Sequence, residues 1–290
     1  MSYLFNDQAN SLREEFVSNN TKIISVVSGK GGVGKSIFSV NVATMLASYD
    51  KNVLLFDSDA GFANASILLG STIQHTLSDY MKGIVSFNEC IQETKYGVKI
   101  VSTGFDYTDW KIFQHNFDGS ILNEFLSIAG DIDYFIIDVG AGYSEKLNNF
   151  YINSDKIFIV TAPEPTAVVN AYSLLKALSY LRVGSEIEIV LNMTKNKEEF
   201  ENIRYALENT VKKFLKKDIN TFYELSYDPN VPLSVKAQIP IVIWKKDSKF
   251  SKDIKKIVED ILNLNVIDKE NSFAKRIKKL FGIDSWLWRE

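Results

Sequence analysis

The sequence predicts an α/β protein in which a mostly parallel, twisted β-sheet carries helices on both faces. Short apolar runs rich in β-branched residues recur along the 290-residue chain, as expected for strands that are covered on both faces. Segments with the apolar spacing of helices lie between these runs. Such alternation is typical of a parallel sheet, because parallel neighbours need a crossover connection.

The predicted elements follow one another through most of the chain. The expected strands cover residues 22–28, 52–58, 98–104, 133–139, 155–161, 186–192 and 221–226. The clearest expected helices cover residues 37–48, 120–129, 167–181, 197–216 and 253–262. Residues 1–20 form a polar extension before this core, and residues 266–290 form a basic, aromatic tail after it. We therefore expect a core domain over residues 21–265.

Composition narrows the class of protein. The net charge of −3 argues against a general nucleic-acid-binding surface. A single cysteine, Cys90, excludes an internal disulfide and fits a reducing compartment. No apolar run reaches the roughly 18–20 residues of a membrane-spanning helix. The first residues are polar and acidic, which is not the pattern of a secretory signal, so we expect a cytoplasmic protein.

One glycine-rich segment predicts a nucleotide site. The stretch GKGGVGKS fits the pattern G-x-x-x-x-G-K-[ST] and lies between a predicted strand and a predicted helix, which is the context that the motif requires. Backbone N–H groups and the helix N-terminus would surround the phosphates. Lys35 would reach the β- and γ-phosphates, and the Ser36 hydroxyl would bind Mg²⁺. The expected binding residues are Gly29, Lys30, Gly31, Gly32, Val33, Gly34, Lys35 and Ser36.

Three aspartates end predicted strands near this loop. Asp138 closes the apolar run YFIID, which is where a carboxylate acts on Mg²⁺ directly or through water. Asp57 and Asp59 lie at the end of the second predicted strand. One carboxylate near Mg²⁺ and another near the attacking water is a sensible division of labour. From spacing alone, either of these two residues also suits a turn.

The motifs together resemble those of a known family. KGGVGKS, with its extra Lys30, resembles the deviant Walker A motif of the MinD/ParA family of P-loop NTPases, the SIMIBI class. LLFDSDAGFANASILLG is similar to that family's switch I, and DYFIIDVGAG to its Walker B and switch II. Asn192, at the end of IEIVLN, resembles the asparagine that reads adenine. The resemblance covers roughly residues 21–265 and implies a slow, dimer-dependent ATPase that uses ATP and Mg²⁺.

The resemblance also assigns roles to single residues. Lys35 is implied as the phosphate-binding lysine, and Asp59 as the residue that positions the hydrolytic water. Asp57 and Asp138 are implied to act around Mg²⁺. Lys30 is implied to cross a dimer interface to the phosphates of the partner's nucleotide. A cation supplied in trans would stabilise charge on the transferring phosphoryl group, so we expect a second copy of the chain to complete the site.

The tail has the pattern of a helix that lies on a lipid surface. Phe273, Ile277, Leu280 and Phe281 would share one face of a helix. Five Lys or Arg and one Glu lie between residues 269 and 281, and each basic residue near anionic lipid contributes about 1 kcal/mol. Two paired tails would bind better than one, so we expect ATP-bound dimers on the inner face of the cell membrane. The alternative is a last helix docked on the body of the protein.

The N-terminal segment resembles a flagellar activator motif. DQANSLREEF, residues 7–16, is similar to the DQAxxLR motif of the flagellar number regulators FlhG, also called FleN or YlxH. In that group the segment stimulates FlhF, a signal-recognition-particle-type GTPase, and the resemblance also implies contacts with flagellar switch-ring proteins. The expected partner-binding residues are Asp7, Gln8, Ala9, Leu12 and Arg13.

Three other functions remain open from the sequence. A MinD-type protein that positions the division site would share the core and the tail but lack DQANSLR. A ParA-type partition protein would bind DNA, against which the acidic net charge and the tail argue. A scaffold would bind ATP without turning it over.

Overall fold

The computed structural model describes residues 21–58, 64–104, 132–181, 183–219, 221–264 and 273–280. The side chains of residues 64, 146, 273–275 and 278 are not among those described. The N-terminal motif, Asp59, the helix expected at 120–129 and Phe281 therefore lie outside the described residues, as does the side chain of Phe273.

The described strands form one eight-stranded sheet in the order β3-β4-β2-β5-β1-β6-β7-β8. Neighbouring strands run parallel, except that β3 pairs antiparallel with β4 at the sheet edge. The predicted fold class is thus confirmed, and only the two-residue β3 was missed. The strands are β1 (Lys22–Val27), β2 (Val53–Asp57), β3 (Gln92–Glu93), β4 (Val98–Ser102), β5 (Tyr134–Asp138), β6 (Lys156–Thr161), β7 (Glu186–Thr194) and β8 (Thr221–Ser226).

Four predicted helices are confirmed, and they begin at or before the expected residue. These are α2 (Lys35–Ser48), α8 (Pro165–Tyr180), α9 (Lys197–Leu215) and α12 (Lys249–Leu262). Shorter elements were not predicted, since one or two turns carry too little periodicity. They are α3 (Asn64–Leu68), α4 (Leu77–Met81), η1 (Phe87–Cys90), η2 (Glu145–Leu147), α7 (Asn148–Ile152), α10 (Asn230–Ala237) and α11 (Ile241–Trp244). The last described element is α13 (Phe273–Leu280). Among the described helices, none is long and apolar enough to cross a bilayer.

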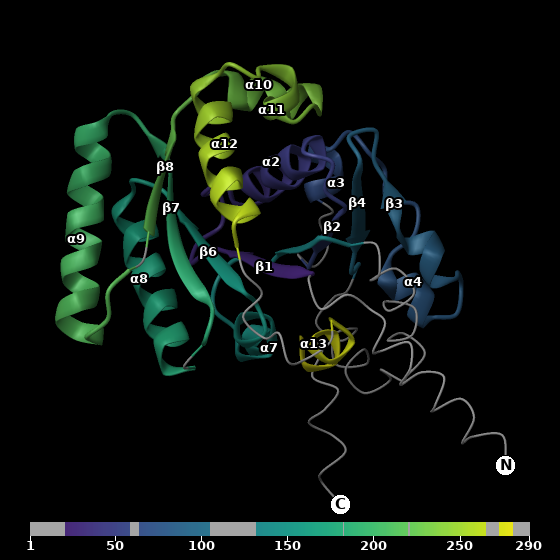
Figure 1. The fold of residues 1–290 in the computed structure, drawn as a ribbon, viewed down its shortest axis with the longest axis horizontal. Coiled ribbons are helices and arrows are strands. Elements are labelled where there is room, and N and C mark those ends of the chain that lie inside the picture. The colour runs from purple at the N-terminus through teal and green to yellow at the C-terminus, as the bar shows by residue number, and fades with distance from the viewer. Residues whose placement is uncertain are drawn as a thin grey trace, which may run out of the picture.

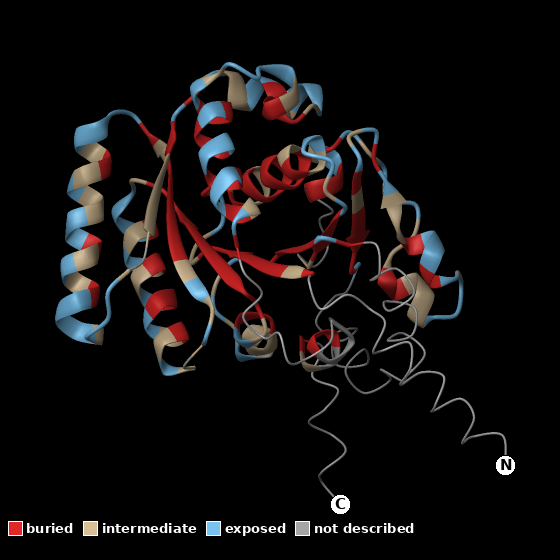
Figure 2. Cartoon of the chain, viewed as in Figure 1, coloured by how far each residue is buried: buried red, intermediate tan, exposed pale blue. Residues whose placement is uncertain are grey.

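Two hydrophobic cores lie on opposite faces of the sheet. Successive strand residues point to opposite sides, so Ile23 and Val27 of β1 join one core while Ile24 and Val26 join the other. Helices α2 and α12 cover one face, and α7 and α13 lie on the other side of the sheet (Figure 1). The central strands are buried along almost their whole length (Figure 2). This matches the near-continuous apolar runs in the sequence.

Helix α13 is docked on the body of the protein. Ile277 is 0% exposed and Leu280 is 1% exposed, and both belong to the core that includes Phe150 and Tyr151 of α7. From the sequence, Ile277 and Leu280 were expected on a face directed at lipid, whereas in this structure they face protein. A periodic apolar face predicts that one side of a helix is buried, but it does not predict what covers that side.

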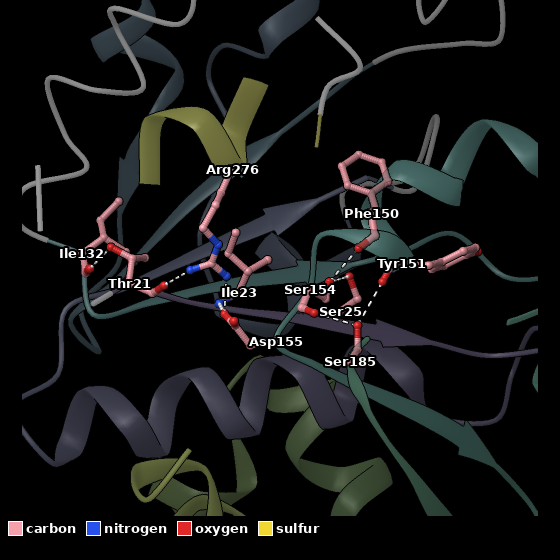
Figure 3. Close-up of polar contacts among 10 residues, drawn as sticks. All are labelled: Thr21, Ile23, Ser25, Ile132, Phe150, Tyr151, Ser154, Asp155, Ser185 and Arg276. Carbon is pink, nitrogen blue, oxygen red and sulfur yellow. Dashed lines mark hydrogen bonds and ion pairs between the residues drawn. The ribbon is translucent and has the colours of Figure 1, made fainter. Parts of the chain in front are cut away.

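A buried arginine fixes the position of α13. The Arg276 guanidinium forms an ion pair with the Asp155 carboxylate and donates to the Thr21 carbonyl at 2.8 Å (Figure 3). Asp155 also accepts from the Ile23 backbone N–H at 2.8 Å. Burial of a charge is costly unless the charge is paired and hydrogen-bonded. The partners of Arg276 therefore tie α13 to the beginning of β1.

Replacing Ile277 by alanine should lower the free energy of unfolding by about 2–5 kcal/mol, because the substitution leaves a cavity in the core. Urea titration followed by circular dichroism measures this change. The matched control is Ile84→Ala, since Ile84 is 65% exposed and such substitutions usually change stability by no more than about 0.5 kcal/mol. Equal stability of the wild type and Ile277→Ala would contradict the docked position of α13.

Candidate nucleotide-binding site

The phosphate loop connects the end of β1 to the start of α2. Gly32 and Gly34 have φ angles of 81° and 88°, in the left-handed region that other residues adopt only with strain. The loop borders a cavity of about 360 Å³ whose lining includes Ser28, Gly31, Gly32, Gly34, Lys35 and Ser36. The cavity lies at the carboxyl ends of parallel strands and at a helix N-terminus, where anionic ligands bind in open α/β sheets.

Asn192 of β7 holds this loop from behind. Its amide nitrogen donates to the Val33 carbonyl at 2.8 Å, and its amide oxygen accepts from the Met193 backbone N–H at 2.9 Å. A Cβ at position 34 would lie 2.2 Å from the Asn192 amide nitrogen, so any other residue there would displace this amide from the phosphate loop. Both ends of the Asn192 amide are thus bonded to protein. For Asn192 to read adenine as expected, its amide would have to exchange these two hydrogen bonds for hydrogen bonds to the base.

Lys35 and Asp138 form a buried ion pair beside the cavity. The Lys35 ammonium lies 2.7 Å from Asp138 Oδ1, and their side chains are 7% and 0% exposed. The Ser39 hydroxyl donates to the same carboxylate oxygen at 2.9 Å. Both buried charges are therefore paired, whereas an unpaired charge in the interior would be strongly destabilising. Because Lys35 also lines the cavity, its ammonium stands between a carboxylate and the expected place of the phosphates.

The residues at this edge suit a hard divalent cation. The other carboxylate oxygen of Asp138, Oδ2, is buried with no hydrogen-bond partner among the described residues. The Ser36 side chain lines the cavity and lies 3.4 Å from the Lys35 ammonium. Mg²⁺ prefers a few protein oxygens together with water and phosphate oxygens. Ser36 and Asp138 would hold the cation, which when bound neutralises phosphate charge.

Asp57 lies next to Asp138, because the two residues are in register between β2 and β5. It is fully buried and accepts a hydrogen bond from the Ala65 backbone N–H at 3.2 Å. The carboxylate therefore anchors the start of α3 in this structure. Its predicted role around Mg²⁺ stays a prediction, as does the role of Asp59, which lies outside the described residues.

A second cavity of about 170 Å³ adjoins the first and shares Ile37 and Met193 with it. Its mainly apolar walls suit a flat nucleobase. Of this lining, the sequence singled out only Asn192, as the expected adenine-reading residue. The rest of the lining comes from α2, from the ends of β7 and β8, and from α10 and α12. The lining residues are Ile37, Asn192, Met193, Ser226, Tyr227, Asp228, Val231, Pro232 and Phe250.

Comparison with known proteins decides the family. A family model named ParA, described as an NUBPL iron-transfer P-loop NTPase, matches residues 19–262. The chain belongs to the ParA family of P-loop NTPases. It is 28% identical over 240 residues to the antiactivator FleN of Pseudomonas aeruginosa, an alignment that spans 83% of this chain and 86% of FleN. It is 32% identical over 183 residues to the flagellum site-determining protein YlxH of Helicobacter pylori, spanning 62% of this chain and 60% of YlxH.

Solved structures of the cell division ATPase MinD share the fold. MinD of Pyrococcus furiosus superposes with a TM-score of 0.66 at 26% identity, covering 84% of this chain and 99% of that one. MinD of Pyrococcus horikoshii, solved with Mg-ADP, also gives 0.66 at 26% identity and covers 83% and 96%. This ParA-family member is an ATPase that uses ATP and Mg²⁺. Lys35 and Ser36 both line the larger cavity, and their roles with phosphate and with Mg²⁺ stay predictions.

Substituting asparagine for Asp138 should raise the Mg²⁺ concentration for half-maximal ATP turnover by about 10- to 100-fold, because the carboxylate that acts on the cation is lost. It should also destabilise the nucleotide-free protein, since Lys35 loses its buried counter-charge. The readouts are phosphate release during Mg²⁺ titration and a thermal melt. Asp247→Asn, at an exposed position, is the control. An Mg²⁺ titration unchanged from the wild type would contradict the assignment of Asp138.

Proposed function

We propose that this chain is a dimerising, membrane-associating ATPase that regulates flagellar number and placement. The observation that carries the proposal is the similarity to the flagellum site-determining protein YlxH at 32% identity. The similarity to FleN over 83% of the chain supports it. The N-terminal DQANSLR segment adds a feature that the shared ATPase core does not require.

Pairing of two ATP-bound chains is supported by Lys30. Its neighbours Gly31 and Gly32 line the phosphate cavity, whereas the Lys30 side chain is 40% exposed and contacts Glu164 at the start of α8. A lysine in the phosphate loop that is turned away from its own cavity is available to a second copy. In the proposed dimer, Lys30 of each chain reaches the partner's phosphates, and water is excluded between the two sites.

Stimulation of the GTPase FlhF is assigned to the N-terminal extension. The contact residues would be Asp7, Gln8, Ala9, Leu12 and Arg13, with Gln8 inserted towards the partner's nucleotide. Components of the flagellar switch ring are further proposed partners, and the acidic net charge argues against nucleic acid.

Membrane association requires that the docked helix α13 leave the body. Ile277 and Leu280 are buried here and would face lipid only after undocking. Helix α7, on which α13 packs, begins at Asn148, shortly after Asp138 and the adjoining switch II segment. We therefore propose that pairing of ATP-bound chains displaces α7 and frees two tails, which bind anionic lipid together with Phe273 and Phe281.

Positioning of the division site is the second candidate. It is favoured by the MinD structures and by 29% identity over 177 residues to the septum site-determining protein MinD of Thermotoga maritima. That alignment covers 60% of this chain. A response of FlhF to the N-terminal extension would separate the two functions.

A peptide of residues 1–20 should stimulate GTP turnover by FlhF from the same organism, and Gln8→Ala should remove the stimulation. The full-length dimer should act in the same way. Phosphate release from GTP measures the effect. Asn10→Ala is the matched control, because position 10 is variable in the DQAxxLR pattern. If neither the peptide nor the full-length protein stimulates FlhF, the flagellar assignment loses its mechanism.

Asp155→Asn should increase sedimentation with anionic vesicles in the absence of ATP, by at least about tenfold, because it breaks the ion pair that holds Arg276 and leaves the tail itself intact. Deleting residues 271–290 from this variant should remove the binding. Asp247→Asn serves as the control for loss of one acidic charge. Identical sedimentation of wild type, Asp155→Asn and the deletion would refute lipid binding by the tail.

A further inference from the structure

Lys30 is bound to its own chain in this structure. Its ammonium lies 2.5 Å from Glu164 Oε2 and donates to the Thr166 hydroxyl at 3.3 Å. Both acceptors belong to the segment PEPT, in which α8 begins. The Lys30 and Glu164 side chains are 40% and 60% exposed, so the pair lies at the surface beside the phosphate cavity.

Close packing of α8 against the phosphate loop brings these groups together. A Cβ at position 29 would lie 2.5 Å from the Asn170 backbone, so only glycine allows this approach. Glu164 is the N-cap residue of α8 and is followed by Pro165 at the first helical position. The short polar side chains of Ser, Thr, Asp and Asn cap a helix by accepting from the backbone of its first turn, whereas Glu164 has a longer side chain that reaches away from the helix.

The Glu164 carboxylate makes no capping bond within the described first turn of α8 and pairs with Lys30 instead. Thr166 lies inside the first turn of α8, and its hydroxyl accepts from the Lys30 ammonium. The polar side chains at the start of α8 are thus directed at the phosphate loop.

We propose that Glu164 is a positioning residue that holds Lys30 on its own chain and thereby opposes ATP-dependent pairing. The inference rests on the proposed function, in which Lys30 crosses to a second copy. In the proposed crossing, the Lys30 ammonium moves away from the Glu164 carboxylate, which belongs to its own chain, to the phosphates of the other chain. Each crossing therefore exchanges one anionic partner, Glu164, for another, the partner's phosphates.

The exposure of the pair determines the size of the effect. A solvent-exposed ion pair typically changes an equilibrium by about 1.4- to fivefold. Because two Lys30–Glu164 pairs separate in a symmetric dimer, their combined effect on the dissociation constant is about 2- to 25-fold. The released Glu164 carboxylate returns to water at little cost. The Lys30–Glu164 ion pair therefore weakens the dimer without preventing its formation. Pairing is then favoured when a strongly anionic phosphate chain is bound in each copy.

The test is the dissociation constant of the full-length dimer, measured by sedimentation velocity with Mg²⁺ and a non-hydrolysable ATP analogue. Glu164→Gln keeps the shape of the side chain and removes its charge, so it should tighten the dimer by about 2- to 25-fold. The matched control is Glu259→Gln, whose pair with Lys255 on α12 is similarly exposed, at 57% and 54%. The control removes the same charge and should leave the dissociation constant unchanged.

Salt separates an ionic restraint from a structural effect. Charges on exposed side chains are screened over about 3 Å at 1 M salt, so wild type and Glu164→Gln should pair equally well near that concentration. Two results would overturn the inference. One is a difference between the dimer dissociation constants of wild type and Glu164→Gln at about 1 M salt. The other is a dissociation constant of Glu164→Gln at low salt that equals or exceeds that of the wild type.

Lys30→Ala separates this inference from the proposed function. The substitution should weaken pairing and abolish the benefit of Glu164→Gln in the double variant. Dimers of wild-type strength in Lys30→Ala would refute the trans role of Lys30 itself. If the wild type does not pair but Glu164→Gln does, the inference is supported in its strongest form; if neither pairs, both proposals are wrong.

Discussion

The buried ion pair of Lys35 and Asp138 is the contact on which the nucleotide site depends. It joins the first residue of α2 to the last residue of β5 and lies beneath the phosphate cavity. The backbone around it is tied together as well, because Ser58 donates from its N–H to the Asp138 carbonyl and Gly142 donates to the Ser28 carbonyl. These contacts therefore connect the phosphate loop with the central strands and with the segments that follow β2 and β5.

Three of the described ion pairs bear on the proposed cycle, and they differ in burial. Lys35 is almost fully buried with Asp138, Lys30 is exposed with Glu164, and Arg276 is buried with Asp155. Breaking a buried pair is costly because it leaves an uncompensated charge, whereas an exposed pair separates easily. Lys30 is thus suited to change partners each time a dimer forms or separates. Arg276 is suited to hold α13 on the body of the protein until a larger rearrangement breaks its buried ion pair.

The position of α7 links these observations to the proposed membrane cycle. Tyr143, the residue after the segment DYFIIDVGAG, stacks on Tyr151 of α7, with ring centroids 6.4 Å apart. Tyr151 belongs to the same core as Ile277 of α13. A rearrangement after Asp138 would therefore reach the docked helix through packed side chains, since close-packed interiors transmit displacement.

Much of the candidate site followed from sequence because its residues are contiguous. The eight residues of GKGGVGKS bring their own turn geometry and their own helix start, so the phosphate cavity was predictable. The base-sized cavity was predictable only at Asn192, because the rest of its lining is drawn from five separate elements that carry no motif for it. The two hydrogen bonds of Asn192 were also unpredictable, since they depend on the approach of β7 to the phosphate loop.

The sequence by itself determined the parallel α/β sheet, the phosphate loop and the amphipathic character of residues 273–281, because each depends on local spacing. The tertiary structure alone decided the partners. It placed Glu164 next to Lys30 across 134 residues, and it covered Ile277 and Leu280 with α7 where lipid had been expected. Both results have the same physical reason. Periodicity in the sequence predicts that a side chain will be in contact with another group, while packing between distant segments determines which group that is.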